Sequence, residues 1–444
     1  MRDISLKICC SPETYLAYRS GGGYCSEAQS YLIGLQSAGV SISAQQHGDG
    51  VSQQYLASLS QASRRFLQSL LSQPPVHDSM PTICVCHSEP GAWHPALYST
   101  SMCPLPGCTA SIGRTMFESD RLPDGWALRL QGMTEVWVPT AFHRSIFLRD
   151  SKLPPSRVRV VPEAVDTRVF APRAGDDLGE QPWIPAPHHT RFISVFKWEH
   201  RKGWDVLLSA WWGAFSSADA ARLYIRTAAY HSRSDFAAAV REYLFDRHGC
   251  NSPNWDAHRS VRGGSGEAWC VRESGTPPST APPPVLVQPE ERELPQIWFV
   301  PPMSEADMPR LYRSMHCLVL PSRGEGWGRP HSEAMATGLP VIATHWSGPT
   351  EFMYTNNSLP LHISGLKAAA TGAFAGHMFA EPDVAHLMQL LQWVHQYPKE
   401  AAALGRQARQ DMVQRFSIPA VTEAVLDALR QLLMTLPVPQ RSEL

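Results

Sequence analysis

The chain has 444 residues, of which 43% are hydrophobic and 18% are charged, a composition typical of a folded globular protein. Its 39 basic and 40 acidic residues leave a net charge of -1, which excludes a general nucleic-acid or polyanion binder. At about 150 residues per domain, the length predicts two or three domains, each able to bury a normal core.

The cysteine pattern and the N-terminal segment predict a cytoplasmic protein. Cys84 and Cys86 are two positions apart and Cys103 and Cys108 are five apart, but no pairs have the spacing of a zinc site. We therefore expect reduced thiols, with the apolar ones in the core, and no bound metal. The N-terminal segment lacks the apolar stretch of a secretory signal, and no run of about 18 apolar residues predicts a transmembrane segment.

The first part of the chain has the pattern of a doubly wound α/β domain, expected over residues 1–172. A strand at 4–10, a glycine-rich loop and a helix at 26–38 are followed by a short strand at 40–44. The further strands that we expect are at 82–86, 110–117, 135–138 and 157–162.

A second α/β domain is expected over 191–418, after a linker at 173–190 that is rich in Pro, Gly, Ala and Asp. Residues 249–289 contain GGSG and TPPSTAPPP, and they are expected to form a low-complexity insertion loop. A last helix at 419–434 carries an apolar stripe at helical spacing and must cover a core. The other elements expected here are strands at 192–196, 222–226, 297–300 and 317–321 and helices at 204–215 and 304–315.

The segment 317–351, CLVLPSRGEGWGRPHSEAMATGLPVIATHWSGPTE, carries the clearest chemical signal. A buried strand runs into a glycine-rich turn, and a helix begins at Pro330 and ends at Gly338 before the next strand, 340–344. The glycines let a ligand approach the backbone, and the N–H groups at the helix N-terminus attract an anion. A phosphate group is therefore the expected ligand of this turn.

Two carboxylates flank these glycines, Glu325 in the turn and Glu333 in the helix, with seven residues between them. Carboxylates accept hydrogen bonds from hydroxyl groups, so a pair beside a phosphate pocket suits a phosphate ester with several hydroxyls. Together with EAMATGLPVIAT and SGPTE, this arrangement resembles the E-x7-E signature of retaining glycosyltransferase family 4 in the GT-B superfamily.

The resemblance implies roles for residues of this segment. Glu333 would bind the ribose hydroxyls of a nucleotide-sugar donor, and Glu325 would hydrogen-bond the donor sugar near its 3-hydroxyl. The further donor-binding positions that it implies are Gly326, Trp327, Gly328, Gly348 and Glu351.

A basic segment follows the strand 192–196. Lys202 precedes a glycine and resembles the family's Lys-Gly, which holds the donor diphosphate. Lys197 occupies the family's arginine position, where it keeps the charge but loses the two-pronged hydrogen bond, and Arg201 can take part of that role in donor binding. Lys202 and Lys197 are expected to act in catalysis by stabilising the leaving diphosphate.

The first domain carries two further resemblances. Gly22 and Gly23, after the first strand, are similar to the family's glycine loop beside the donor phosphates. The segment His87-Ser88-Glu89-Pro90 at a strand end resembles the acceptor-side histidine segment of the family. His87 is the expected catalytic residue there, with Ser88 as the alternative position.

The resemblance covers most of 20–425 and implies an α/β fold of the GT-B kind, with two facing Rossmann-like domains and an interdomain cleft. The last helix would then pack back on the first domain. The implied activity is transfer of a hexose from a nucleoside-diphosphate sugar to a hydroxyl of a carbohydrate, lipid or protein, with retention of configuration and no metal. Neither the base nor the sugar is readable from the sequence.

Alternatives of other kinds stay open. One is a catalytically idle nucleotide- or sugar-binding scaffold of the same fold. An epimerase or a phosphorylase of this fold is another, although the pyridoxal-lysine motif of a phosphorylase is not found. A Rossmann dehydrogenase is the weakest, because residues 21–26 lack the third glycine of G-x-G-x-x-G.

Overall fold

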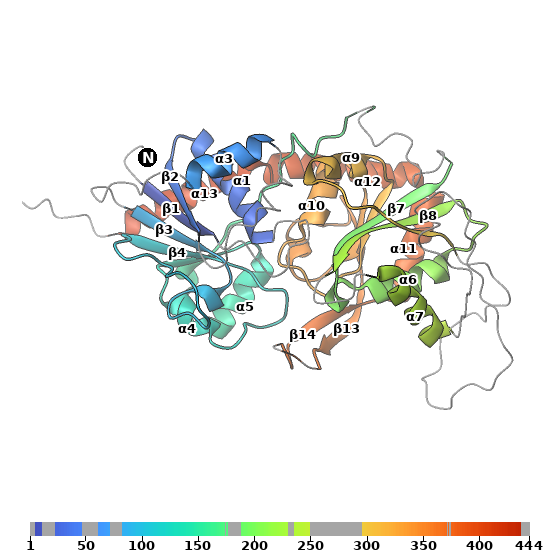
Figure 1. Ribbon diagram of the computed structural model, residues 1–444, viewed down its shortest axis with the longest axis horizontal. Helices are drawn as coiled ribbons and strands as arrows, with labels where there is room; N and C mark the ends of the chain where they lie inside the picture. Colours follow the sequence, from blue (N-terminus) through green and yellow to red (C-terminus); the bar gives the residue numbers. More distant parts are fainter. Residues whose placement is uncertain are drawn as a thin grey trace, which may run out of the picture.

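The computed structural model describes residues 5–10, 23–46, 61–71, 82–173, 175, 188–229, 235–248, 295–370, 372 and 374–436. It has two lobes side by side, each built on a six-stranded sheet (Figure 1). The blue and cyan elements form the first lobe, and most of the green to orange elements form the second. The lobes are called the first and the second domain below.

The first sheet is entirely parallel, with the strand order β2-β1-β3-β4-β5-β6. Helices cover a parallel sheet on both faces, so its strands read as continuous apolar runs, and every residue of β3 is buried. The strands are β1 (Ser5–Cys10), β2 (Ser41–Gln46), β3 (Thr82–His87), β4 (Ala110–Arg114), β5 (Glu135–Val138) and β6 (Val158–Val160). The helices are α1 (Gly23–Ser37), α3 (Gln61–Leu71), α4 (Trp126–Gln131) and α5 (Ala141–Ser151).

The strand β4 is shorter than the expected 110–117. It ends at Arg114, and the chain that follows turns toward the second domain, where Asp120 N donates to Met378 O at 3.2 Å. Its departure from the sheet places residues 116–120 against the second domain, which the alternation of apolar residues in this segment does not reveal.

The second sheet is also parallel, with the order β12-β11-β10-β7-β8-β9. Its strands are β7 (Thr190–Trp198), β8 (Ala221–Ala229), β9 (Ile297–Phe299), β10 (Cys317–Leu320), β11 (Val341–Thr344) and β12 (Leu359–Leu361). The helices are α6 (Trp204–Ala214), α7 (Phe236–His248), α9 (Met308–Arg313), α10 (Arg329–Ala336), α11 (Val384–Gln396) and α12 (Pro398–Arg415). Short 3-10 helices are η1 (Pro90–Ala92), η2 (Pro155–Arg157), η3 (His200–Lys202), η4 (Glu305–Asp307) and η5 (Gly348–Glu351).

An antiparallel pair, β13 (Ile363–Ala368) and β14 (Met378–Pro382), extends from the second domain below the two lobes in the view of Figure 1. It contacts the first domain: Ser119 Oγ lies 2.7 Å from His377 Nδ1, and the rings of Phe117 and Phe374 are 5.1 Å apart. The pair therefore ties the two domains together away from the linker.

The last helix, α13 (Ile418–Thr435), belongs to the core of the first domain although it follows the second domain in sequence. Its buried residues Val421, Val425 and Leu429 share a hydrophobic cluster with Leu32 and Ile83. In Figure 1 the red α13 lies among the blue elements of the first lobe. The apolar stripe in its sequence thus covers the sheet of the other domain.

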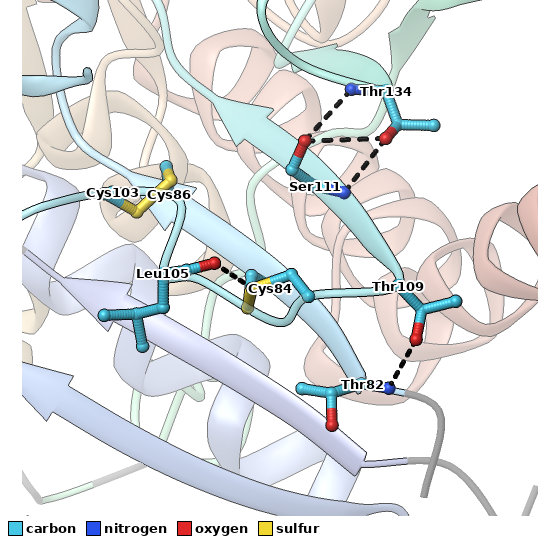
Figure 2. The surroundings of a disulfide bond; sticks show 9 residues. Thr82, Cys84, Cys86, Cys103, Leu105, Thr109, Ser111 and Thr134 are labelled. Atoms are coloured by element: carbon cyan, nitrogen blue, oxygen red, sulfur yellow. Dashed lines mark hydrogen bonds between the residues drawn. A yellow bond between two sulfur atoms is a disulfide. The ribbon is translucent and has the colours of Figure 1, made fainter. Parts of the chain in front are cut away.

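Two disulfides correct the expectation of reduced thiols. Cys84 pairs with Cys108 and Cys86 pairs with Cys103 (Figure 2). Alternate residues of a strand point to the same face, so Cys84 and Cys86 of β3 face one loop, and that loop returns both partners before β4. Figure 2 also shows Thr82 N bonded to Thr109 Oγ1, which fixes the end of the same loop.

Some expected features lie outside the described residues, namely the insertion at 249–289 and most of the linker at 173–190. Within the described ranges, no helix combines the length and the apolar character that crossing a membrane requires.

Candidate functional site

The second sheet reverses its strand order beside its first strand. β7 lies between β8 and β10, so the chain builds the sheet outward on one side of β7 and then on the other. Ligands of open parallel sheets bind outside the carboxyl ends of the strands at such a switch point. The segments that leave β7 and β10 carry Lys202 and Glu325, respectively.

Lys202 and Glu325 meet in an ion pair at this switch point. Lys202 Nζ donates to both carboxylate oxygens of Glu325, at 2.8 Å each, and their side chains are only 15% and 10% exposed. Burial raises the pKa of Glu325, but Lys202, Arg201 and His331 outweigh it and bring that pKa to about 2. Glu325 is therefore ionised at neutral pH and can only accept hydrogen bonds.

Arg201 braces the glycine-rich turn. Its Nη1 donates to Gly324 O at 2.7 Å, its Nη2 donates to Glu199 at 2.9 Å, and it lies 3.4 Å from Glu118 of the first domain. Lys197 lies within β7, with its side chain partly buried. Lys197 takes no part in the hydrogen bonds between Lys202 and Glu325.

Close packing leaves no room for a side chain at three glycines of the turn and of η5. A Cβ on Gly348 would overlap the carbonyl of Gly326. On Gly326 it would overlap Met116, and on Gly324 it would overlap the carbonyl of Glu118. Met116 and Glu118 belong to the first domain, so the turn is pressed against that domain as well as against η5.

Glu333 lies on α10, which follows the turn. Tyr312 Oη donates to Glu333 at 3.3 Å, and Arg329 Nε lies 3.7 Å from it. Gly328, at φ 101°, precedes the helix in a conformation that favours glycine, and a Cβ there would lie 2.6 Å from His331 Nδ1. The His331 ring therefore requires a residue without a side chain just before α10.

Two other predicted donor residues, Trp327 and Glu351, make contacts outside this group. The ring of Trp327 packs in the core of the second domain, with centroids 4.7 Å from Phe352 and 5.4 Å from Phe416. Glu351 accepts a 2.8 Å hydrogen bond from the backbone N–H of Ala141, at the start of α5 in the first domain. Burial raises the pKa of Glu351. Glu351 therefore bridges the domains at the N-terminus of α5, where the Ala141 N–H offsets part of the cost of burying the carboxylate.

His87 lies in a separate buried cluster at the carboxyl end of the first sheet. Its Nε2 is 2.9 Å from Glu27 Oε2, and Arg114 Nε donates to Glu27 Oε1 at 2.7 Å. Arg114 also donates to Val161 O at 2.6 Å and lies over the ring of Tyr31. Burial raises the pKa of Glu27, but Arg114 and His87 outweigh it and bring that pKa to about 2.

The predicted glycine loop precedes this cluster. Gly22 lies outside the described residues, and Gly23 is the first residue of α1, the helix that supplies Glu27. β1 lies between β2 and β3, so the first sheet has its own switch point at β1 and β3. His87 ends β3 at that point, as the ligand rule for open sheets requires.

Glu163 connects the two switch points. It follows β6 in the first domain, is 1% exposed, and lies 3.6 Å from Arg329 of α10. Arg329 in turn pairs with Glu333. Burial and the nearby Glu27 raise the pKa of Glu163 well above its ordinary value, although Arg329 opposes this. Glu27 is thus ionised, whereas Glu163 binds a proton more readily than an ordinary glutamate does.

The sequence reasoning missed Glu27, Arg114 and Glu163, because each reads as an isolated charged residue in an ordinary helix, strand or loop. The sequence could have indicated His331, since this residue lies between the two motif glutamates. The sequence could also have indicated Arg329, because it lies four residues before Glu333 and residues four apart on a helix are neighbours.

The described residues include no group of three or more His, Cys, Asp or Glu placed to hold a metal ion. A cavity of about 580 Å³ lies away from Glu325, lined by residues of the linker, α9 and α12, such as Arg173, Arg313 and Pro398. The assignment of the Lys202–Glu325 group as a candidate site therefore depends on the contacts and charges of its side chains and not on this cavity.

Residues 288–411 match the family described as Glycosyl transferases group 1. The D-inositol 3-phosphate glycosyltransferase of Saccharomonospora viridis is 29% identical over 133 residues, which is 30% of this chain and 27% of that protein. The protein of the same name from Mycobacterium avium is 26% identical over 136 residues, 31% of this chain and 28% of that protein. The chain thus matches about a quarter of the length of these curated relatives.

Solved structures share the whole fold. Anabaena Alr3699/HepE, in complex with UDP and glucose, has a TM-score of 0.57 at 10% identity, over 96% of this chain and 99% of that chain. Sucrose-phosphate synthase from Thermosynechococcus elongatus has a TM-score of 0.58 at 14% identity, over 97% and 99%. The expected α/β fold of the GT-B kind, with two parallel sheets, is confirmed, and the family match to Glycosyl transferases group 1 falls within the second domain.

Proposed function

We propose that this protein transfers a sugar, a hexose, from a nucleoside-diphosphate sugar to a hydroxyl group of an acceptor. The observation that carries the proposal is the Lys202–Glu325 pair at the β7/β10 switch point, beside a glycine-rich turn and the start of α10. A cation, N–H dipoles and carboxylates that converge there suit a diphosphate joined to sugars. The group 1 family match over 288–411 and the UDP bound by the Anabaena neighbour support it.

The proposed donor occupies the second domain. Glu333, held by Tyr312 and Arg329, would accept hydrogen bonds from the ribose. Lys202 would exchange part of its contact with Glu325 for the diphosphate, with Arg201 beside it. Glu325 would then accept a hydrogen bond from the sugar.

In the proposed reaction the acceptor oxygen bonds to the anomeric carbon as the bond from that carbon to the diphosphate breaks. Negative charge grows on the leaving oxygen, and Lys202, with Arg201 beside it, would stabilise that charge in place of a metal ion. For a retaining transfer, the leaving diphosphate oxygen takes the proton of the acceptor hydroxyl on the same face. His87, at the switch point of the first sheet, would orient the acceptor.

The first test is a thermal-shift panel with UDP, GDP, ADP and their glucose conjugates, in the presence of a chelator. A ligand at about 100 times its dissociation constant adds about 2.7 kcal/mol to the stability of the folded protein. We expect one base to stabilise the wild type, and Glu333→Ala to lose that effect. Glu400→Ala, which removes an exposed carboxylate of α12, is the matched control and should keep it.

Absence of any nucleotide shift in the wild type would remove the proposal and favour an idle scaffold that binds a sugar without a nucleotide. Once the donor is known, NMR of the first-formed product reports the anomeric configuration. An inverted product would rule out the same-face transfer while leaving the transferase activity intact.

A further inference from the structure

His331 is a buried histidine of α10 with unused hydrogen-bonding capacity. Its exposed fraction is 0%, and within the described part of the chain neither ring nitrogen reaches a partner at full hydrogen-bond geometry, although the backbone of Gly328 lies close enough to act on the ring. Buried polar atoms are usually satisfied, and one left without a partner costs stability. By contrast, His143, which is equally buried, bonds to Thr140 through Nδ1 and to Phe117 O through Nε2.

The His331 ring fits because the neighbouring residue 328 has no side chain. A Cβ at residue 328 would lie 2.6 Å from His331 Nδ1 and 3.1 Å from its Cγ, so the ring fits only because residue 328 is glycine. A leucine would fill the same space without burying two polar nitrogens. The ring and the Gly328 conformation together point to a ligand rather than to packing.

The ring lies against Gly328, the glycine between the Glu325 turn and α10. Residues 331 and 333 differ by about 200° around a helix, so their side chains point in different directions. Glu333 meets Tyr312, whereas the charges that act on His331 are Glu325 and Lys202. Under the proposed function, this side holds the donor sugar and the other side holds the ribose.

The imidazole is neutral in this position. Burial lowers the pKa of His331 to about 4 and Lys202 adds to this shift, although Glu325 and the backbone of Gly328 oppose it. A neutral imidazole has one donor and one acceptor nitrogen, and a hydroxyl group also has both functions. A phosphate oxygen would use only the donor. The chemistry of the ring therefore matches a sugar hydroxyl better than the diphosphate.

We propose that His331 hydrogen-bonds a hydroxyl group of the donor sugar and thereby sets which sugar the enzyme accepts. The inference rests on the proposed function. It assigns to His331 a contact beside Glu325, and it explains why a buried histidine keeps ring nitrogens that make no well-formed hydrogen bond in the free protein.

The test compares binding of UDP with binding of UDP-glucose, UDP-galactose and UDP-N-acetylglucosamine by calorimetry, using the full chain. If the panel above selects another base, the corresponding conjugates replace these. We expect His331→Leu to bind the free nucleoside diphosphate within twofold of the wild type and the preferred nucleotide sugar about tenfold more weakly. Its melting temperature without ligand should be no lower than that of the wild type.

Two further variants sharpen the comparison. Tyr312→Phe removes the hydroxyl that holds Glu333, so it should weaken UDP and the nucleotide sugars by the same factor. His331→Gln keeps a donor and an acceptor at altered positions, so it should change the order of preference among the three sugars.

The outcomes separate this inference from the proposed function. Equal loss of UDP and nucleotide-sugar binding in His331→Leu overturns the inference, as does wild-type affinity for the nucleotide sugar. Both results leave nucleotide binding, and hence the proposed function, standing. Failure of the wild type to bind any nucleotide removes the proposed function first. If His331→Leu does not fold, an unchanged sugar preference in His331→Gln overturns the inference.

Discussion

The buried ion pair of the first domain gives a stability prediction that can be worked from its geometry. In Glu27→Gln, Arg114 keeps its charge at 0% exposure but loses the carboxylate that accepts from it. Removing one partner of a buried ion pair costs about 3–5 kcal/mol, because the other charge is left uncompensated. The pKa of Glu27, lowered from 4.5 to about 2, corresponds to about 3 kcal/mol by linkage, the same order of magnitude.

The pH dependence follows from the direction of this shift. The folded protein holds the Glu27 proton less tightly than the unfolded chain, so the stabilisation is complete above pH 4.5 and is lost as the pH falls toward 2. About 1 kcal/mol of it is gone at pH 4. The difference in unfolding free energy between wild type and Glu27→Gln should therefore shrink by about that amount between pH 7 and pH 4.

Urea unfolding followed by tryptophan fluorescence measures both quantities. Asp427→Asn is the control, since it breaks an exposed ion pair with Arg430 on α13 and should cost less than about 1 kcal/mol. The double variant Glu27→Gln/Arg114→Met should recover part of the loss, because no buried charge remains. An effect of Glu27→Gln no larger than that of Asp427→Asn, with no recovery in the double variant, would refute the reasoning.

Three further predictions concern other contacts. Gly348→Ala should abolish nucleotide-induced thermal stabilisation, because its Cβ meets the rigid backbone of Gly326. The control Gly39→Ala has open space around it, so it should lower the free energy of unfolding by only about 1 kcal/mol and leave nucleotide binding intact. Equal effects of the two variants on nucleotide binding would contradict this. Gly34→Ala should lower the melting temperature by overlap with Thr422 of α13, and adding Thr422→Ala should restore part of it, which two independent effects would not produce. The two disulfides should block their four thiols from alkylation until a reductant is added, and labelling without reductant would show them absent.

The sequence is enough to bring together most residues of the proposed second-domain site, because that signal is local. The turn before α10 places Glu325 and Glu333 through residues that are neighbours in the chain, and the resemblance adds Lys202. The His87 cluster has no such signal, since Glu27 comes from a helix 60 positions earlier and Arg114 from the next strand. The assignment of these side chains to one point requires the strand order, which the sequence alone does not determine.

The error about the cysteines has the same cause. Cys84 and Cys86 were compared with metal-binding spacings, which describe ligands within one or two turns of chain. Their actual partners are set by the face of β3 on which both side chains lie and by the return path of the loop before β4. A strand with cysteines two apart, followed by a second cysteine pair before the next strand, is itself a pattern compatible with two disulfides.

The glycines of the motif have two separate duties. Gly324 and Gly326 were interpreted as room for a ligand, yet the atoms that a Cβ would meet there belong to Glu118 and Met116 of the first domain. A glycine in this turn therefore indicates close approach of the two domains as much as approach of a phosphate. Gly348 is different, because its neighbour is the turn itself. Since Arg201 also reaches Glu118, the turn that would bind the donor is positioned partly by the first domain, and donor binding and domain contact are expected to be coupled.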